Sequence, residues 1–438
     1  MSTPHIVILG GGFGGLYCAK ALREAPVHIT LVDRKNHHLF QPLLYQVATA
    51  ALDASDIASP LRQIFAAQQN VRVILGEVVS IDTGRQRVIL EDAELAYDGL
   101  IVATGVTHTY FGHPEYEKLA PGLKTIEDAL EIRRRVFSAF EEAERTADPA
   151  ELARLMTFVL VGGGPTGVEL AGALAEIARE TLPGEFRHID PTTAKVLLVE
   201  ANTSLLTSYP EELRESAAAQ LRGLGVELKL GARVTNVTER GVTVDGALIP
   251  CATVLWAAGV AASPVVKSLG VPLDRSGRVI VQPDLSIPGH PNVFVVGDLA
   301  SMVSDGKPVP GVAQGAIQGG QRAADNLRRV LNGESTVPFH YHDRGSLATI
   351  GRARAVADLG KIKLSGPPAW LVWAGIHILF LIGFRNRLSV GLSWAWAWLT
   401  RGRQARLITG RTPLLDAVAR QTVAPPELPT GESARAAV

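Results

Sequence analysis

Two similar glycine-rich turns constrain this chain more than any other feature. A short β-branched run at residues 6–9 ends in Gly-Gly-Gly-Phe-Gly-Gly at 10–15, and residues 158–161 end in Gly-Gly-Gly-Pro-Thr-Gly at 162–167. A segment rich in alanine and leucine follows each turn. Each copy therefore predicts a strand, a tight turn and a helix.

A second landmark repeats at the same distance from each turn. Residues 98–105 and residues 252–259 are both short apolar runs that end in small residues and a glycine. These final glycines lie 95 and 97 positions after the first glycine of their turns. Matching landmarks at matching spacing indicate two copies of one nucleotide-binding unit. The expected fold class is α/β, with two Rossmann-like dinucleotide-binding domains.

Both turns fit the pattern G-x-G-x-x-G between a strand and a helix, which is the context that dinucleotide binding needs. The first glycine makes the tight turn, the second lets backbone N–H groups approach a pyrophosphate, and the third lets helix and strand pack closely. The helix N-terminus adds partial positive charge. The residues in these places are Gly10, Gly12 and Gly15, and Gly162, Gly164 and Gly167.

An acidic residue ends the strand that follows each turn. Asp33 lies 18 residues past Gly15, close to the offset of about 20 expected for a carboxylate that binds a ribose. Glu200 lies 33 residues past Gly167, and a loop at 182–193 accounts for the excess. A carboxylate repels a 2′-phosphate, and no arginine follows among the next four residues. The second unit is therefore expected to bind NADH rather than NADPH.

The bulk composition excludes several other functions. The chain has 438 residues, which is too long for one core, and a net charge of +0, which offers no basic field for nucleic acid. Cys18 and Cys251 form no C-x-x-C pair, so neither a disulfide framework nor dithiol chemistry is expected. The 11 histidines form no ligand cluster, so we expect no metal. The N-terminus shows no export signal, which favours a cytoplasmic location.

These features together resemble the type II, non-proton-pumping NADH:quinone oxidoreductases, flavoproteins related to the disulfide reductases. The resemblance extends from Gly10 to about Leu399, and its most specific segments are residues 40–48, 162–169, 295–298 and 313–318. It implies FAD in the first unit and NADH in the second. The chain lacks the flavin-side cysteine pair of the disulfide reductases, so electrons must leave the flavin by another route.

The resemblance also implies an order of domains. Residues 1–120 and 270–338 are expected to form a discontinuous FAD-binding domain, into which an NADH-binding domain of residues 121–269 is inserted. Residues 339–412 are expected to form a C-terminal region for membrane anchoring or dimerisation, and residues 413–438 a disordered tail.

The functional positions of the family are carried over onto the matching residues. Gly297 and Asp298 match a second FAD motif, in which the aspartate binds the ribityl chain. The expected FAD contacts are Gly10, Gly12, Phe13, Gly14, Gly15, Asp33, Arg34, Val79, Ala103, Thr104, Gly105, Gly297, Asp298 and Ala313. The expected NADH contacts are Gly162, Gly164, Pro165, Thr166, Gly167, Glu200, Ala258 and Gly259.

Four polar residues are expected to act in catalysis. Gln314 and Gln318 lie four apart on a helix predicted over 312–331, and the family places them where an amide can bond a quinone carbonyl. The polar face of a surface helix is the alternative. Glu169 is expected near the nicotinamide and flavin, to orient the nicotinamide or to assist proton delivery, unless it only complements its helix N-terminus. Gln46 belongs to the flavin-side loop.

The C-terminal region is apolar and rich in tryptophan. Residues 369–384 are apolar apart from His377, but these 16 residues fall short of the ~20 needed to span a bilayer. Five of the six tryptophans lie between positions 370 and 398, with arginines nearby. Tryptophan beside arginine suits helices that lie in the bilayer interface. A face buried in a dimer or against the core is the alternative, and His377 is expected to pack rather than to catalyse.

The expected function is hydride transfer from NADH to FAD, followed by transfer of two electrons to a membrane quinone, in a ping-pong-like cycle. The expected partners are NADH, a lipophilic quinone, the cytoplasmic face of the cell membrane and a second copy in a homodimer. Two alternatives stay open. One is a soluble NADH-dependent reductase of a ferredoxin-type protein, and the other is a redox-responsive signalling protein that binds NAD and FAD.

Overall fold

The computed structural model describes residues 3–403 and 405–409, and two parallel sheets lie at its centre. The first sheet has the order β20-β21-β9-β1-β2-β5, parallel except where β20 pairs with β21. The second has the order β13-β12-β11-β17 and is parallel throughout. The strands are β1 (His5–Leu9), β2 (His28–Asp33), β5 (Val71–Leu75), β9 (Gly99–Val102), β20 (Ser286–Ile287), β21 (His290–Val295), β11 (Thr157–Val161), β12 (Lys195–Glu200), β13 (Val226–Leu230) and β17 (Thr253–Trp256).

The two sheets share one topology. In each, the strand before the glycine turn pairs on one side with the strand that ends in the acid, and on the other with the strand that ends in the second landmark. The predicted duplication of a Rossmann-like unit is therefore confirmed. β1 is almost wholly buried and β11 completely so, because a central strand of a parallel sheet that is covered on both faces must be apolar along its whole length.

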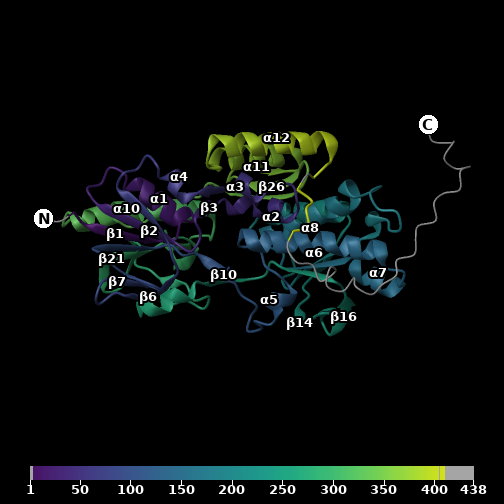
Figure 1. Ribbon diagram of the computed structural model, residues 1–438, viewed down its shortest axis with the longest axis horizontal. Helices are drawn as coiled ribbons and strands as arrows, with labels where there is room; N and C mark the ends of the chain where they lie inside the picture. The colour runs from purple at the N-terminus through teal and green to yellow at the C-terminus, as the bar shows by residue number, and fades with distance from the viewer. Residues whose placement is uncertain (1–2, 404, 410–438) are drawn as a thin grey trace, which may run out of the picture.

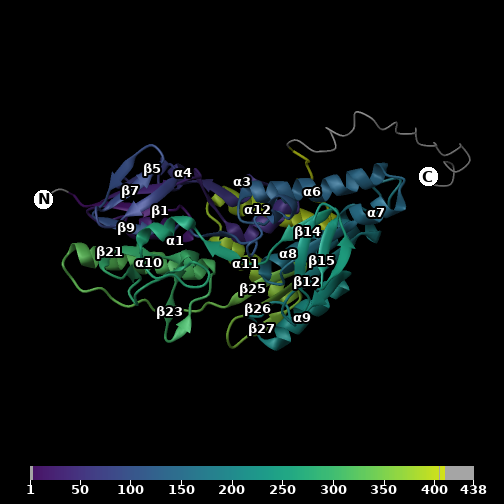
Figure 2. The same cartoon turned by 90° about the horizontal axis from the view of Figure 1, so that it is seen from below.

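Helices and small antiparallel sheets surround these centres, with the first unit on the left of Figure 1 and the second on the right. α1 and α10 pack against each other in the first unit, and Figure 2 shows them side by side. The helices are α1 (Phe13–Ala21), α4 (Leu61–Ile64), α10 (Ala313–Leu331), α5 (Tyr116–Leu119), α6 (Ile126–Arg145), α7 (Pro149–Leu155), α8 (Pro165–Glu176) and α9 (Glu211–Gly223). The antiparallel strands are β3 (His37–Leu39), β4 (Ala58–Pro60), β6 (Val78–Asp82), β7 (Arg87–Leu90), β8 (Glu94–Ala96), β14 (Val234–Thr238), β15 (Gly241–Val244) and β16 (Ala247–Pro250).

A two-stranded antiparallel ribbon, β10 (Val106–His108) with β18 (Val260–Ala262), connects the two units. After β18, the 3-10 helix Pro264–Leu269 packs into the core of the first unit. The hydroxyl group of Ser268 accepts the backbone N–H of Ile81 at 2.9 Å. Residues 264–269 therefore pack with the first domain, although the sequence placed them in the second.

A segment of the first unit packs with the second. α2 (Leu44–Ala48) lies against α6 and joins the core cluster of the second unit. Arg133 of α6, only 4 % exposed, holds this segment because its guanidinium donates to the backbone carbonyls of Val47 and Leu52. α3 (Ala54–Ile57) follows. The loop that the resemblance assigns to the flavin side is thus fastened to the second unit.

A three-stranded antiparallel sheet precedes the C-terminal helices, and the sequence patterns do not predict it. It consists of β25 (Ser346–Gly351), β26 (Arg354–Asp358) and β27 (Lys363–Ser365). β25 lies directly on α8, where a Cβ on Gly172 would be 1.6 Å from the carbonyl oxygen of Ile350. The C-terminal layer therefore rests on the same helix that begins at the second glycine turn.

α11 (Pro367–Phe380) and α12 (Phe384–Thr400) form the outer layer at the top of Figure 1. In the part of the chain that the structure describes, none of the helices is long and apolar enough to cross a membrane. The Nδ1 atom of His377 lies 2.6 Å from the carbonyl oxygen of Trp373, and burial lowers the pKa of His377 to about 4. This histidine is packed, as expected. The predicted tail, residues 413–438, lies outside the described residues.

Candidate functional site

Each glycine turn is closed by contacts that leave no room for a side chain. Gly10 and Gly162 have φ values of +101° and +110°, which L-residues rarely adopt. A Cβ on Gly15 would lie 1.9 Å from the carbonyl oxygen of Gly10, and a Cβ on Gly167 equally close to that of Gly162. In both turns, the first glycine thus makes the tight turn and the third lets the helix pack closely on the strand, as the motif requires.

The middle glycine of each turn faces open space. Among the described residues, no heavy atom lies within 4 Å of the position that a Cβ on Gly12 or Gly164 would take. These glycines are the N-caps of α1 and α8, and they have no side chain that could bond the first N–H groups of the helix. Available N–H groups, the helix dipole and an open approach fit a pyrophosphate at both turns. The residues present therefore fit FAD and NADH.

The two strand-end carboxylates bond back to the turns. Asp33 accepts the backbone N–H of Gly11 at 2.5 Å, and Glu200 accepts that of Gly163 at 2.5 Å. Glu200 also accepts the backbone and side-chain N–H groups of Asn202, at 2.7 and 2.6 Å. These bonds hold each carboxylate at the edge of its turn, where the ribose of a dinucleotide lies in this fold.

Most other residues expected at FAD gather near the first turn. The carbonyl oxygen of Ala103 would lie 2.3 Å from a Cβ on Gly10, so the turn that ends β9 abuts the glycine turn. The hydroxyl group of Thr104 is buried and has no partner among the described residues, as expected of a group that bonds a cofactor. Val79, on β6, is 57 % exposed and lies outside the central sheet. The others stand at the start of α1 (Phe13, Gly14), after β2 (Arg34), after β9 (Gly105), after β21 (Gly297, Asp298) and at the start of α10 (Ala313).

The remaining residues expected at NADH surround the second turn. Pro165 is the first residue of α8 and Thr166 the second. Ala258 and Gly259 follow β17, and the backbone N–H of Ala258 would lie 2.9 Å from a Cβ on Gly162. The structure therefore brings both halves of the predicted NADH contact set together at one sheet edge.

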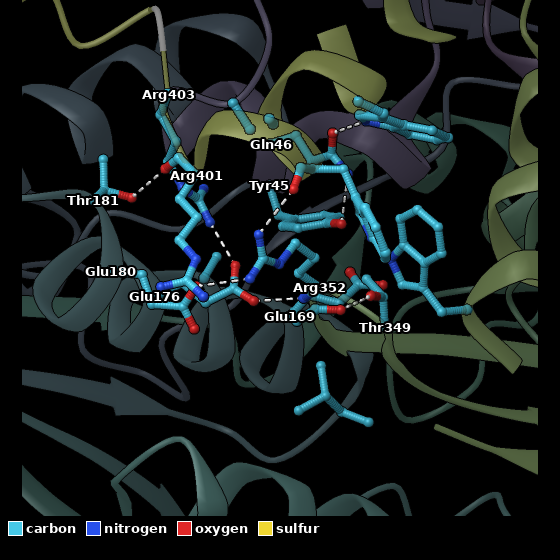
Figure 3. A pocket seen from close by; sticks show the side chains of 18 of the residues that line it. Tyr45, Gln46, Glu169, Glu176, Glu180, Thr181, Thr349, Arg352, Arg401 and Arg403 are labelled. Carbon is cyan, nitrogen blue, oxygen red and sulfur yellow. Dashed lines mark hydrogen bonds and ion pairs between the residues drawn. The ribbon is translucent and has the colours of Figure 1, made fainter. Parts of the chain in front are cut away.

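A cavity of about 110 Å³ lies between α8 and the C-terminal layer. Its wall joins polar side chains from α2, α8 and the β25–β26 turn to tryptophans from α11 and α12 (Figure 3). These tryptophans are Trp370, Trp373, Trp394 and Trp398. A wall that combines indole rings with polar and charged side chains suits a flat molecule that carries oxygens on an apolar ring.

Glu169 lines this cavity and also a second one. The second cavity, of about 70 Å³, is formed with Thr166 of the second glycine turn, Tyr45 and Lys124. Burial raises the pKa of Glu169 well above its usual range, although a backbone hydrogen bond from Thr349 lowers it. Burial thus favours the protonated form of a carboxyl group that lines two cavities, and such a group can give a proton to either side.

Lys124 is a residue of this second cavity that sequence reasoning missed. Burial lowers the pKa of Lys124, and the carboxylate of Asp298 acts in the opposite direction. Its ammonium group thus lies in the electric field of a residue expected to bind FAD. Lys124 directly precedes Thr125, the N-cap of α6, and belongs to none of the motifs described above, so the sequence around position 124 carries no signal for this placement.

Gln46 is bonded on both sides of its amide. Its Nε2 donates to the hydroxyl of Tyr45 at 2.7 Å, and its Oε1 accepts the indole N–H of Trp394 at 2.7 Å. Gln46 and Tyr45 are buried. The flavin-side loop is therefore bonded directly to α12, 348 positions later in the chain.

Gln314 and Gln318 lie on α10, away from the wall of the larger cavity. The Nε2 of Gln318 donates to the carbonyl of His342 at 3.0 Å, and its Oε1 accepts the backbone N–H of His342 at 2.9 Å. Nε2 also lies 3.4 Å from Oε1 of Gln314. Gln318 thus holds the segment that leads to β25, and the quinone contact expected of both glutamines stays a prediction.

Glu176 is a second carboxylate of the larger cavity, and sequence reasoning did not single it out. Its Oε2 accepts Nη2 of Arg403 at 2.8 Å, and its Oε1 accepts the backbone N–H of Arg352 (Figure 3). Arg403 also donates to the backbone carbonyl and the hydroxyl of Thr49, both at 3.0 Å. The seven-residue spacing from Glu169 could have indicated Glu176, because such residues share a helix face. The position of Arg403 depends on how the chain returns after α12.

Within residues 3–403 and 405–409, no group of three His, Cys, Asp or Glu side chains could hold a metal ion. Cys18 and Cys251 are both buried as free thiols. Burial raises the pKa of Cys251 to about 11, so this thiol is inert at neutral pH.

Two family models together match most of the chain. Residues 4–320 match the family described as pyridine nucleotide-disulphide oxidoreductase, and residues 343–404 match the NDH2 C-terminal domain. The type II NADH:quinone oxidoreductase Ndh of Mycobacterium tuberculosis is 48 % identical over 92 % of this chain and 90 % of its own length. The type II NADH:quinone oxidoreductase of Staphylococcus aureus is 31 % identical over 83 % of this chain and 92 % of its own length.

A solved structure shares the fold. NDH2 from Plasmodium falciparum in complex with NADH superposes with a TM-score of 0.83 at 19 % identity, over 90 % of this chain and 98 % of that one. The duplicated sheets, the C-terminal layer on α8 and the sequence identity over nearly the full length all indicate the same family. The chain therefore belongs to the type II NADH:quinone oxidoreductase family.

Proposed function

We propose that this protein oxidises NADH through a bound FAD and reduces a lipophilic quinone in the cavity between α8 and the C-terminal helices. The observation that carries the proposal is the wall of that cavity, which joins tryptophans of the outer helices to Glu169. Glu169 lies about one helical turn inside α8, whose N-terminus fits the NADH pyrophosphate. A molecule that enters from an apolar surface there meets the nucleotide site, and relatives with NADH:quinone oxidoreductase names support this assignment.

When bound, FAD accepts a hydride from NADH and delivers two electrons to the quinone. The task of the chain is to bind and orient both nucleotides. The N-terminus of α1 and Asp33 hold the pyrophosphate and ribose of FAD, with Asp298 at its ribityl chain. The N-terminus of α8 and Glu200 do the same for NADH.

The polar residues of the cavity handle protons and the quinone oxygens. Glu169 holds a proton between the two cavities, which makes proton transfer its task rather than nicotinamide orientation alone. Gln46 and Tyr45 place an amide and a phenol in the wall that a quinone faces. Gln314 and Gln318 lie outside the wall of this cavity, so the contact proposed for them is with a quinone that reaches beyond the cavity to α10.

Stopped-flow absorbance of the bound flavin tests the function in two half-reactions. The flavin of the wild-type protein should be bleached by NADH and restored by a short-chain ubiquinone. In Glu169→Gln, the first half-reaction should persist and the second should slow about 100-fold, the typical contribution of a positioned acid. Wild-type flavin that ubiquinone cannot reoxidise would refute the quinone assignment.

The glutamines of α10 need a separate variant. Gln314→Leu combined with Gln318→Leu should depress reoxidation by quinone while reduction by NADH stays intact. An equal loss of both half-reactions would contradict their assignment to the quinone.

We further propose that α11 and α12 bind the cytoplasmic face of the cell membrane, where NADH is available. Their large apolar side chains at the molecular surface are Leu371 (66 % exposed), Leu379 (68 %), Phe384 (82 %), Leu388 (52 %), Leu392 (62 %), Trp396 (54 %), Trp398 (52 %) and Leu399 (79 %). Vesicles with anionic phospholipid should bind the wild-type protein and release Leu379→Glu combined with Phe384→Glu. A second copy in a homodimer is the alternative occupant, and sedimentation velocity of the same variant distinguishes it.

A further inference from the structure

Three carboxyl groups lie along one side of α8 and its π-helical continuation, Ile177–Thr181. Glu169, Glu176 and Glu180 follow one another at intervals of seven and four residues, and all three line the larger cavity (Figure 3). The side chain of Glu176 is 13 % exposed and that of Glu180 is 32 % exposed. The row therefore runs from a site next to the nucleotide turn toward solvent.

Quinone reduction, the proposed function on which this inference rests, needs a path for protons such as this row of carboxyl groups. NADH, a proton and a quinone give NAD⁺ and a quinol. The hydride of NADH carries both electrons and one hydrogen, so the second hydrogen of the quinol must arrive as a proton from solution. The tryptophan walls of the cavity offer that proton no oxygen, and only the α8 side is lined by carboxylates.

We propose that Glu180 and Glu176 are the proton inlet of this reaction, passing one proton per turnover from solvent to Glu169. Each carboxyl group releases a proton to the next as it takes one from the group before it. Glu169 gives its proton to a quinone oxygen, where the new O–H bond forms. All three groups then return to their starting state, so atoms and charge balance.

The geometry suits transfer through water. Seven residues of α-helix rise by about 10.5 Å, which is too far for a direct hydrogen bond between Glu169 and Glu176. The cavity of about 110 Å³ has room for roughly three water molecules when no quinone occupies it. Ala173 lies between the two glutamates on the same wall and is too small to close the gap. The hydroxyl oxygen of Tyr45, which also lines the cavity, accepts a hydrogen bond from Nε2 of Gln46. The O–H of Tyr45 therefore remains available as a donor to water.

Arginines keep both charge states of Glu176 within reach. Burial raises the pKa of Glu176 and so does nearby Glu180, whereas Arg403 and Arg352 lower it. Burial, the largest effect, favours the protonated form of Glu176, and the arginines favour its ionised form. Arg401 and Tyr45 also line the cavity beside this pair. A relay needs a group that can both lose and regain its proton.

A purely structural role is the competing explanation, because the Glu176–Arg403 pair also fastens the segment after α12. Glu185 offers a matched control. It pairs with Arg406 of the same segment, but it lies outside the cavity wall. Breaking that pair loosens the segment without touching the carboxylate row.

The test compares Glu176→Gln, Glu185→Gln and the wild type as full-length, FAD-loaded proteins. Flavin reduced by NADH is reoxidised either by a short-chain ubiquinone, which takes up protons, or by ferricyanide, which takes electrons only. In Glu176→Gln, reoxidation by ubiquinone should slow about 100-fold. Its rate should fall as pH rises and should drop further in D₂O, while ferricyanide reoxidation stays at the wild-type rate. Glu185→Gln should match the wild type throughout.

Several results would overturn the proposal that Glu180 and Glu176 pass a proton to Glu169. They are an unchanged ubiquinone rate in Glu176→Gln, an equal loss with ferricyanide, a change in quinone KM alone, or the same defect in Glu185→Gln. If Glu176→Gln does not retain FAD, the double variant Glu176→Gln/Arg403→Gln removes both charges of the pair and takes its place. Failure of the wild type with ubiquinone would instead refute the proposed function.

Discussion

Replacing Arg133 by methionine tests how the flavin-side loop is held to the second unit. The guanidinium donates from Nε and Nη2 to the carbonyl oxygen of Val47, at 2.8 and 2.6 Å, and from Nη2 to that of Leu52 at 2.9 Å. Methionine keeps most of the volume but leaves both carbonyls without a donor. Each orphaned carbonyl costs about 1–3 kcal/mol, and removing a buried charge returns part of that cost. We expect a net loss of roughly 2–4 kcal/mol.

Urea unfolding of the FAD-loaded protein measures this loss, and Arg134→Met is the matched control. Arg134 forms a two-point ion pair with Glu131 of the same helix, at 2.7 and 2.6 Å, and its loss leaves no backbone carbonyl without a donor, so Arg134→Met should cost less than Arg133→Met. Arg133→Met should also slow reoxidation of the flavin by ubiquinone, because α2 carries Tyr45 and Gln46. Equal destabilisation by the two substitutions would refute the reasoning.

Three further predictions follow from single sites. Glu200→Gln removes the charge that repels a 2′-phosphate, while its one amide oxygen can still accept either the N–H of Gly163 or those of Asn202; kcat/KM for NADPH relative to NADH should rise about tenfold, and an unchanged ratio would contradict the role. Gly172→Ala would press a Cβ against the carbonyl oxygen of Ile350 and should lower stability by about 3 kcal/mol, whereas Gly375→Ala, in open space on α11, should not; calorimetry decides between them. Burial holds the pKa of His377 at about 4, below its value of 6.5 in the unfolded chain, so stability should fall as pH decreases from 6.5 to 4, by about 3 kcal/mol. Thermal unfolding of His377→Leu should show a weaker pH dependence in that window.

The Rossmann-like units could be read from the sequence because their information is local. Gly10 and Gly15 lie in one turn, and the helix that follows begins within the same few residues. Neighbouring positions therefore specify the geometry of the whole motif. To predict the position of Asp33, only one further strand, β2, had to be recognised. The boundary between the domains was placed less well, since residues 264–269 pack into the first core through contacts that no local pattern contains.

The C-terminal layer shows the opposite case. Apolar character and tryptophans indicated helices beyond residue 369, and α11 and α12 occur there. The sheet β25–β27 was missed because its strands are short and its partner surface is α8, far away in the chain. Gly172 makes that contact possible, yet a glycine inside a helix does not disclose which carbonyl approaches it.

The local sequence pattern by itself determined that the chain has two dinucleotide turns and that Glu169 follows the second. It also determined which strand-end acid lies beside each turn. Only the tertiary structure decided what faces Glu169. The cavity is assembled from α2, α8, the β25–β26 turn, α11 and α12, and the pairs Gln46–Trp394 and Glu176–Arg403 join residues 348 and 227 positions apart. Strand, turn and helix geometry is specified within about 20 residues, whereas a cavity exists only where separate elements pack and leave space between them.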